Sequence, residues 1–213
     1  MGVRDALGRP LHDLRISLLD RCNFRCPYCM PETEFHEDYQ FLTRSQRLTH
    51  EEILTIARVA TGLGVSKLRL TGGEPLLDKN IDSLIAQELA DAGLHRVTIS
   101  LDSLDEEVFS QMSGGRGDLA QVLNGLEAAA AEGIAPIKIN VVVERGVNDH
   151  TVIDLLENFR GTGHIVRLIE YMDVGNRNGW RMNQVVPSRE LLQMIKARWP
   201  LRRMDPNYAG EVA

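Results

Sequence analysis

Only three cysteines occur in the 213 residues of this sequence, and other residue types that mark special protein classes are scarce too. Aromatic residues make up 5% of the chain, no apolar run approaches a membrane span, and the start of the chain lacks the apolar core of a signal peptide. The net charge is -6 and the basic residues are dispersed, which leaves no electrostatic footprint for nucleic acid or for an anionic membrane. We therefore expect a cytoplasmic protein with reduced thiols rather than a disulfide framework.

The three cysteines are crowded into one short segment, "DRCNFRCPYCMP" (Asp20–Pro31), at Cys22, Cys26 and Cys29. In a reducing compartment such crowding indicates metal binding or catalysis. A structural zinc site normally has four ligands, and His36 is the candidate for the fourth. An iron–sulfur cluster held by three cysteines would instead leave one iron with an open position, which by analogy with other metal sites indicates catalysis. Three incidental cysteines are the third interpretation.

Strand-like and helix-like segments alternate along the chain. Strands are expected at 14–19, 67–71, 97–102, 137–143 and 165–170, and helices at 49–64, 80–93, 106–112, 119–132 and 151–159. In the first helix Thr49 and Glu52 form a capping box, and the residues expected to face inward are Ile53, Ile56, Ala60 and Leu63. The alternation predicts an α/β fold, with a parallel sheet covered by helices and either open or curled into a barrel, in a single domain over 1–213.

The unusual motifs gather at one end of this predicted sheet. In parallel α/β folds, ligands bind beyond the carboxyl ends of the strands. The cysteine segment follows the first strand, "TGGEP" (Thr71–Pro75) the second, "SLDS" (Ser100–Ser103) the third and "EYMDVGN" (Glu170–Asn176) the fifth. This convergence predicts one ligand site at that end.

Two sets of motifs resemble a known family. The spacing Cys-x-x-x-Cys-x-x-Cys with Tyr28 before the last cysteine, together with "GGEP", resembles the radical S-adenosylmethionine (SAM) enzymes. The wider set "LRISLLDRCNFRCPYCMP", "KLRLTGGEPLL", "VTISLDSLD", "IKINVVV", "RGVND" and "VRLIEYMDVG" is similar to the molybdenum cofactor biosynthesis protein A (MoaA) family of GTP 3',8-cyclases. The resemblance runs from Gly8 to Ala213. It implies a partial parallel (β/α) TIM-like barrel of the radical SAM type, with five recognisable strands where the family has six.

The same resemblance implies roles for individual residues. The metal ligands would be Cys22, Cys26 and Cys29, holding one [4Fe–4S] cluster whose open iron binds SAM. The SAM pocket would be formed by Tyr28, Gly73, Ser100 and Met172, with Glu74 and Asn140 as further contacts. The residues facing GTP would be Arg15, Lys67, Arg69, Lys138 and Arg167.

The positions of these basic residues support a polyanionic ligand independently of the resemblance. Each of them interrupts an otherwise apolar strand, and Lys67 and Arg69 share one strand face by their period-two spacing. A cation directed into a barrel is costly unless it is paired, so several directed at one cavity indicate a polyanion. The competing interpretation for any one of them is an outward-facing or ion-paired side chain.

Two features depart from the family pattern. A strand–helix unit with a Thr-Thr-Asn-Gly motif, which the family has between the "GGEP" and "SLD" strands, has no counterpart here. The segment reads as two family helices fused into one with its apolar face kept, so the flanking strands could still pair through a right-handed crossover. No cysteine follows Cys29, so we expect neither the family's second cluster nor the contacts it makes with the GTP base.

The function implied by the resemblance is that of a radical SAM GTP 3',8-cyclase, a lyase of molybdenum cofactor biosynthesis. Such an enzyme converts GTP to a cyclised pterin precursor after hydrogen abstraction by a deoxyadenosyl radical. The implied partners are GTP, SAM, a reductant protein such as flavodoxin or ferredoxin, and, as one option, a second copy in a homodimer. The alternatives are a radical SAM enzyme acting on another small molecule or a peptide, and a non-catalytic module that binds the cluster or SAM.

Overall fold

The computed structural model describes residues 3–74, 77, 98–131, 135–174 and 178–205, and within these ranges the chain forms two parallel sheets. The first contains β1 (Asp13–Ser17) and β2 (Lys67–Thr71), and the second contains β3 (Thr98–Ser100), β4 (Lys138–Val143) and β5 (Ile165–Glu170) in that order. All pairings are parallel. The α/β fold and the five predicted strands are therefore confirmed, whereas the helix predicted over 80–93 lies outside the described residues.

The first sheet packs against one helix, α1 (His50–Gly62). The contact is made by alternate strand residues and one stripe of the helix, namely Leu14, Ile16, Leu68 and Leu70 against Ile53 and Ala57. The predicted capping box is present, because the Glu52 amide donates to the Thr49 hydroxyl at 3.2 Å and the Thr49 amide donates to the Glu52 carboxylate at 2.7 Å. This cap begins the helix at His50, one turn before Ile53, the first residue of the packed stripe.

The predicted inward face of α1 is only half right. Ile53 and Ala60 are buried, but the side chains of Ile56 and Leu63 are 38% and 43% exposed. Ala57 is buried in their place, so the packed stripe follows the spacing i, i+4, i+7. Two strands make a narrow sheet, and it covers only this narrow stripe of the helix.

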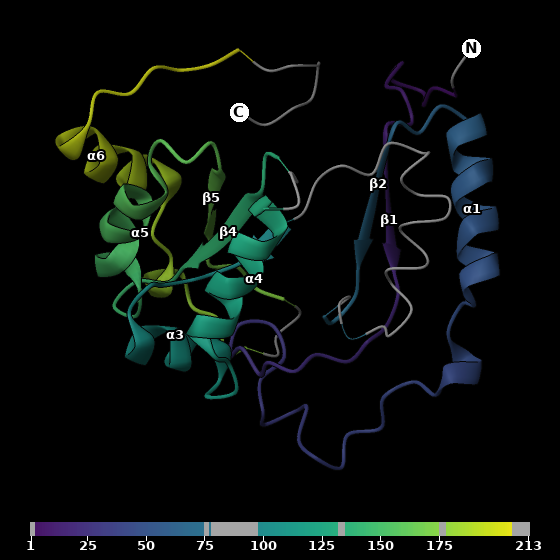
Figure 1. The fold of residues 1–213 in the computed structure, drawn as a ribbon, viewed down its shortest axis with the longest axis horizontal. Coiled ribbons are helices and arrows are strands. Elements are labelled where there is room, and N and C mark those ends of the chain that lie inside the picture. The colour runs from purple at the N-terminus through teal and green to yellow at the C-terminus, as the bar shows by residue number, and fades with distance from the viewer. Residues whose placement is uncertain (1–2, 75–76, 78–97, 132–134, 175–177, 206–213) are drawn as a thin grey trace.

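The second sheet carries the larger core. Its helices are α3 (Glu106–Ser113), α4 (Leu119–Ala131), α5 (Val152–Phe159) and α6 (Ser188–Arg198). Alternate residues of β4, Ile139, Val141 and Val143, are fully buried among side chains from these helices. Helix α6 was not predicted from the sequence, yet its Leu191 joins the same core. In Figure 1, α5 and α6 lie on the side of β4 and β5 that faces away from β1 and β2.

A break separates β2 from β3. No ladder joins these two strands within the described ranges, so the direct pairing considered from the sequence is not observed. Figure 1 shows β1, β2 and α1 on one side and β4 and β5 with α3–α6 on the other, and β3 pairs with β4. The two parts also have separate apolar clusters, one around Ile53 and one around Leu155. Among the described residues, therefore, each sheet is held by its own apolar cluster.

The strand faces opposite the helix-packed ones carry most of the polar strand residues, and we name them the inner faces. On the first sheet the inner face consists of Asp13, Arg15 and Ser17 of β1 beside Lys67, Arg69 and Thr71 of β2. On the second sheet it includes Ser100 beside Asn140 beside Arg167, and Thr98 beside Lys138. Figure 1 places β1 and β2 between α1 and the second sheet, so the first inner face is turned toward that sheet.

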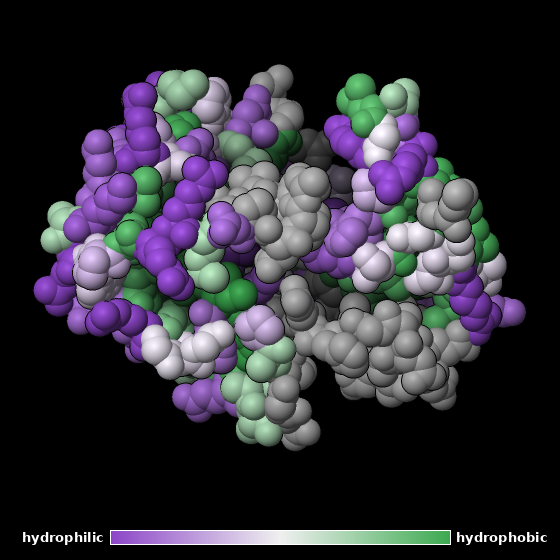
Figure 2. All heavy atoms as spheres, turned by 90° about the horizontal axis from the view of Figure 1, so that it is seen from above, coloured by the Kyte–Doolittle hydropathy of each residue, from purple (hydrophilic) through white to green (hydrophobic). Residues whose placement is uncertain are grey.

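The outer surface is largely hydrophilic in the view from above. Figure 2 shows hydrophilic residues over most of the outer left part and the upper right part, with hydrophobic residues visible between them. Within the described ranges no helix is long and apolar enough to cross a membrane.

Candidate active site

The three cysteines lie in the loop that leaves the carboxyl end of β1. The Cys26 carbonyl accepts hydrogen bonds from the amides of Cys29 and Met30, both at 3.0 Å, so the chain turns back on itself. The Phe24 amide donates to Cys22 Sγ at 3.4 Å. Cys22 and Cys26 are partly buried, and Cys29 is exposed. The turn thus brings the backbones of Cys26 and Cys29 together and leaves Cys29 exposed.

Burial makes the three thiols of this loop hard to deprotonate. Burial raises the pKa of all three thiols, to about 12 at Cys26, where the charges of the other two cysteines also contribute. The described residues contain no group of three His, Cys, Asp or Glu that could share one ion. A bound cluster takes its cysteines as thiolates, so loading it would release these thiol protons.

The glycine pair that follows β2 packs against the cysteine loop. The amides of Gly73 and Glu74 donate to the carbonyls of Leu19 and Arg21, both at 2.8 Å. A Cβ on Gly73 would lie 2.9 Å from the Cys22 nitrogen and closer still to the Arg21 carbonyl. Only glycine allows this approach of two backbones. The sequence predicted a close approach of Gly73 to SAM, and the neighbour seen in the structure is the cysteine loop itself.

Tyr28 links the cysteine loop to the second sheet. Its hydroxyl donates to the Asp102 carboxylate at 2.5 Å, and the Val142 amide donates to the other oxygen of that carboxylate at 2.8 Å. Burial raises the pKa of Asp102 to about 6, and burial together with the Asp102 charge raises the pKa of Tyr28 well above its usual value. The contact places the loop at the carboxyl ends of β3 and β4.

The other residues predicted to bind SAM lie around this contact. Ser100 and Asn140 are neighbours in the β3–β4 ladder, and Asn140 Oδ1 is buried without a hydrogen-bond partner in the described part of the chain. A buried acceptor without a donor costs free energy that a bound ligand can recover. Glu74 is close enough for its charge to help raise the pKa of Cys22, after the larger effect of burial. Met172 follows β5, and its side chain is 52% exposed.

The five basic residues predicted to face GTP divide between the two inner faces. Arg15, Lys67 and Arg69 share the first, where Arg15 lies opposite Arg69 in the ladder. Lys138 and Arg167 lie on the second, on neighbouring strands. The structure therefore brings three of them together on one ladder and the other two together on another.

Two of these cations have an internal counter-ion. Asp13 Oδ1 lies 3.3 Å from Lys67 Nζ and 3.5 Å from Arg69 Nε, and the other Asp13 oxygen lies 3.0 Å from His12 Nδ1. Burial pushes the pKa of Asp13 up, but the hydrogen bond with His12 and the two cations outweigh it and the pKa is lowered. The ion-paired interpretation thus holds for Lys67 and Arg69. With Arg15 on the same face, cations still outnumber the carboxylate.

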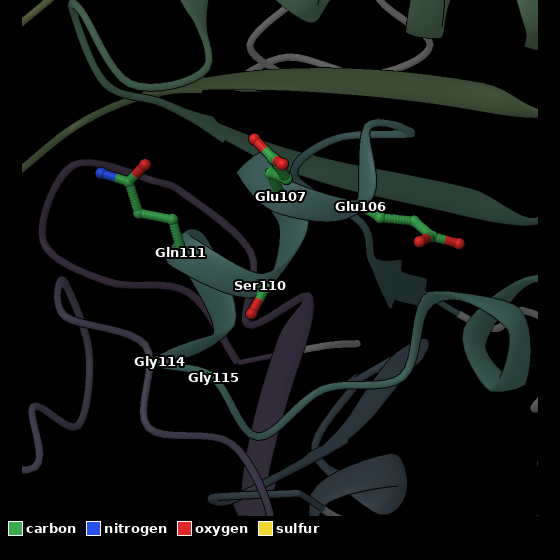
Figure 3. Close-up of a pocket in the computed structure, with 6 residues that line it drawn as sticks. All are labelled: Glu106, Glu107, Ser110, Gln111, Gly114 and Gly115. Carbon is green, nitrogen blue, oxygen red and sulfur yellow. The ribbon is translucent and has the colours of Figure 1, made fainter.

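A separate hollow of about 630 Å³ lies on α3 and contains none of the residues predicted from the sequence. It is lined by Glu106, Glu107, Ser110, Gln111, Gly114 and Gly115. Figure 3 shows these side chains on the helix surface, with Glu106 directed away from Gln111. The hollow is a surface feature of α3 and lies apart from the inner faces.

Three charged residues at the site were not selected from the sequence. Asp13 precedes the predicted strand, Arg25 stands next to Cys26, and Asp102 lies within "SLDS". The feature that could have identified them is a charged residue within or beside a predicted site motif. Charged side chains are rarely buried without a partner, and Arg25 and Asp102 are only 8% and 7% exposed. Their burial therefore distinguishes them from ordinary surface charges.

Comparison with known proteins first gives the class. The sequence-family model of the radical SAM superfamily matches residues 16–88 and 84–159 of this chain. The fold is similar to that of TYW1 with a lysine–pyruvate adduct bound, with a TM-score of 0.62 and 19% identity over 88% of this chain and 72% of that one. It is also similar to that of methylornithine synthase (PylB), with a TM-score of 0.62 and 17% identity. That match covers 86% of this chain and 61% of the other. The chain is therefore a radical SAM protein, and this superfamily implies a [4Fe–4S] cluster and SAM.

Curated relatives then give the particular family. The GTP 3',8-cyclase of Xanthomonas campestris pv. campestris strain 8004 is 48% identical over 235 residues, covering 99% of this chain and 69% of that protein. The enzymes of that name from Acidothermus cellulolyticus and Staphylococcus haemolyticus are 47% and 42% identical and are covered to 65% and 69%. The chain belongs to the GTP 3',8-cyclase family.

The alignment also supports the internal departure noted in the sequence. It spans 235 positions, whereas this chain has 213 residues, so at least 22 positions must be gaps in this chain. A deletion of that size corresponds to about one strand, one short helix and their turns. It agrees with the missing strand–helix unit and with the break between β2 and β3.

Proposed function

We propose that this chain carries out the radical SAM chemistry of a GTP 3',8-cyclase within a single domain over 1–213. The observation that carries the proposal is the position of the cysteine loop. The loop is held by Gly73 on one side and by Asp102 on the other. It therefore lies at the carboxyl ends of strands whose inner faces carry the five cations. A reductive cofactor and a nucleotide triphosphate would meet in this arrangement.

The cofactor site is assigned from the same contacts. Cys22, Cys26 and Cys29 would hold the cluster, and the bound cluster and SAM would supply a deoxyadenosyl radical. The SAM contacts would come from Tyr28, Gly73, Glu74, Ser100, Asn140 and Met172. Among these, Asn140 has the clearest support, because its buried oxygen has no donor among the described residues. Tyr28 keeps its proton at neutral pH, since its pKa is raised, and its hydroxyl holds the loop against Asp102.

The substrate site is assigned from charge. Arg15, Lys67 and Arg69 would attract the triphosphate from the first sheet, and Lys138 and Arg167 from the second. Phosphate groups would compete with Asp13 for Lys67 and Arg69. The role of these residues would be to hold the ribose of GTP within reach of the deoxyadenosyl radical. The radical would remove a ribose hydrogen, and the resulting ribose radical would then bond to the purine ring. A misplacement of about 1 Å at such a centre can cost about a hundredfold in rate.

The internal departure from the family pattern has a consequence for this reaction. The family's strand–helix unit with the Thr-Thr-Asn-Gly motif has no counterpart in this sequence, so one strand's share of the nucleotide site would be lost. The triphosphate would then be attracted while the ribose is held less firmly. We therefore expect SAM cleavage to exceed cyclisation. The reductant would be a protein such as flavodoxin or ferredoxin, and a homodimer is the assembly to test first.

The test is an anaerobic reaction of the reconstituted chain with GTP, SAM and a reductant, followed by mass spectrometry. We expect 5'-deoxyadenosine together with a smaller amount of a cyclised GTP isomer, and neither product from Cys26→Ala. ATP in place of GTP controls for the nucleotide. Deoxyadenosine with no change in GTP would favour a radical SAM enzyme for another substrate. A loaded cluster that binds SAM and produces neither would favour a non-catalytic module.

A further inference from the structure

Arg25 is a buried cation inside the cysteine loop. Its side chain is 8% exposed, and it stands between Phe24 and Cys26 in the chain. The guanidinium donates to three carbonyls: Nε to Phe35 at 2.7 Å, and Nη1 to Cys22 at 2.8 Å and Phe24 at 2.9 Å. These acceptors lie on both sides of the turn. A planar group with several fixed donors can satisfy such a set, whereas a lysine ammonium presents a single charged point.

The charge of Arg25 is only loosely neutralised. In the described part of the chain, the carboxylate paired with it is that of Glu32, with an Nε–Oε2 distance of 3.7 Å. Glu32 makes a shorter contact, 2.7 Å, with Arg116. The guanidinium also lies over the ring of Phe41 at 5.8 Å. The guanidinium of Arg25 therefore lies within the cysteine loop itself, 2.8 Å from the carbonyl oxygen of Cys22.

The backbone at Arg25 is anchored to α3. The Arg25 amide donates to the Ser113 carbonyl at 3.0 Å. Gly114 ends the helix in the left-handed region, at φ +71°, and a Cβ there would overlap the Arg25 backbone. The side chain thus fixes the loop internally, while the backbone fixes it to the second part of the molecule.

We propose that Arg25 is a positioning residue for the three-cysteine loop and a fixed positive charge that raises the reduction potential of the cluster bound there. The second half of this proposal rests on the proposed function, because it requires a cluster. A cluster held by thiolates is anionic, and its potential depends on net charge and on nearby donors. A cation that also shapes the ligand loop affects both the loading and the potential.

The test compares Arg25→Gln and Arg25→Lys with the matched control Arg116→Gln. Arg116 bonds to the same Glu32, but it is 39% exposed and donates to no carbonyl of the cysteine loop in the described part of the chain. After anaerobic reconstitution we expect Arg25→Gln to retain less than half of the iron and sulfide of the parent and to show a lower midpoint potential in the loaded fraction. Arg25→Lys should lose iron but keep the parent potential, because it keeps the charge. Arg116→Gln should match the parent in both.

Two outcomes overturn the proposal separately. Full loading of Arg25→Gln would overturn the positioning role, and an unchanged potential in its loaded fraction would overturn the electrostatic role. Circular dichroism melts of the cluster-free variants show whether each is folded. If no cluster forms in the parent, that result counts against the proposed function alone. The positioning role is then tested by amide exchange in the cluster-free parent and in cluster-free Arg25→Lys. Exchange at Cys29 and Met30 should be at least tenfold faster in Arg25→Lys, and equal rates would overturn that role.

Discussion

A methyl group added at Gly73 is the smallest change that tests whether the end of β2 supports the cysteine loop. In Gly73→Ala the new Cβ would lie 2.9 Å from the Cys22 nitrogen and closer to the Arg21 carbonyl, where Cβ atoms essentially never lie within 3.0 Å. The neighbours are backbone atoms, so no side chain can swing away. Relief requires a shift on the order of 1 Å, and overpacking of this kind costs about 1–3 kcal/mol.

The same shift disturbs the hydrogen bonds that join the two segments. The amides of Gly73 and Glu74 donate across this contact at 2.8 Å. Losing one such bond adds about 1 kcal/mol, so we expect Gly73→Ala to lower the free energy of unfolding by about 2–4 kcal/mol in total. The loop should also move away from its cluster-binding shape. Iron content should therefore fall together with stability, and SAM affinity should fall further in Gly73→Val.

The assay is urea denaturation of the cluster-free protein together with iron analysis after reconstitution. The matched control is Gly125→Ala in α4, where a Cβ meets nothing within 4 Å. A helical alanine there should raise stability by about 0.5–1 kcal/mol and leave the iron content unchanged. If Gly73→Ala unfolds at the parent's urea midpoint and loads a full cluster, the close approach of the two backbones does not support the loop.

Two further predictions concern the cluster and the cations. The three-cysteine loop should bind one oxygen-sensitive four-iron cluster per chain, measured by iron and sulfide analysis with paramagnetic resonance; stoichiometric zinc, or two clusters per chain, would contradict this. Inorganic triphosphate should bind severalfold more tightly to Asp13→Asn and severalfold more weakly to Lys67→Met than to the parent, as measured by calorimetry, because Asp13 competes for Lys67. Equal affinities in Asp13→Asn and the parent would show that this carboxylate does not compete.

The sequence by itself determined the elements and the chemistry-bearing loop. Strand periodicity located β2 and β5 to the residue, and the capping box at Thr49 located the start of α1, because both signals are local. The cysteine spacing and the motifs after the strands were local as well. Helix α6 was not predicted, although Leu191, Met194 and Ile195 recur at helical spacing. The core contact of Leu191 shows which side of the helix is buried.

Only the tertiary structure decided which partners these local features meet. The Asp13 contacts with Lys67 and Arg69 depend on the register of β1 against β2, and the Tyr28–Asp102 bond joins residues 74 positions apart. Only the structure shows that, in the described ranges, no ladder joins β2 to β3 and each sheet has its own apolar cluster. Arg25 is the clearest case. In the sequence it is one basic residue among 24, and it becomes a buried charge with three carbonyl partners only when the loop folds back over it.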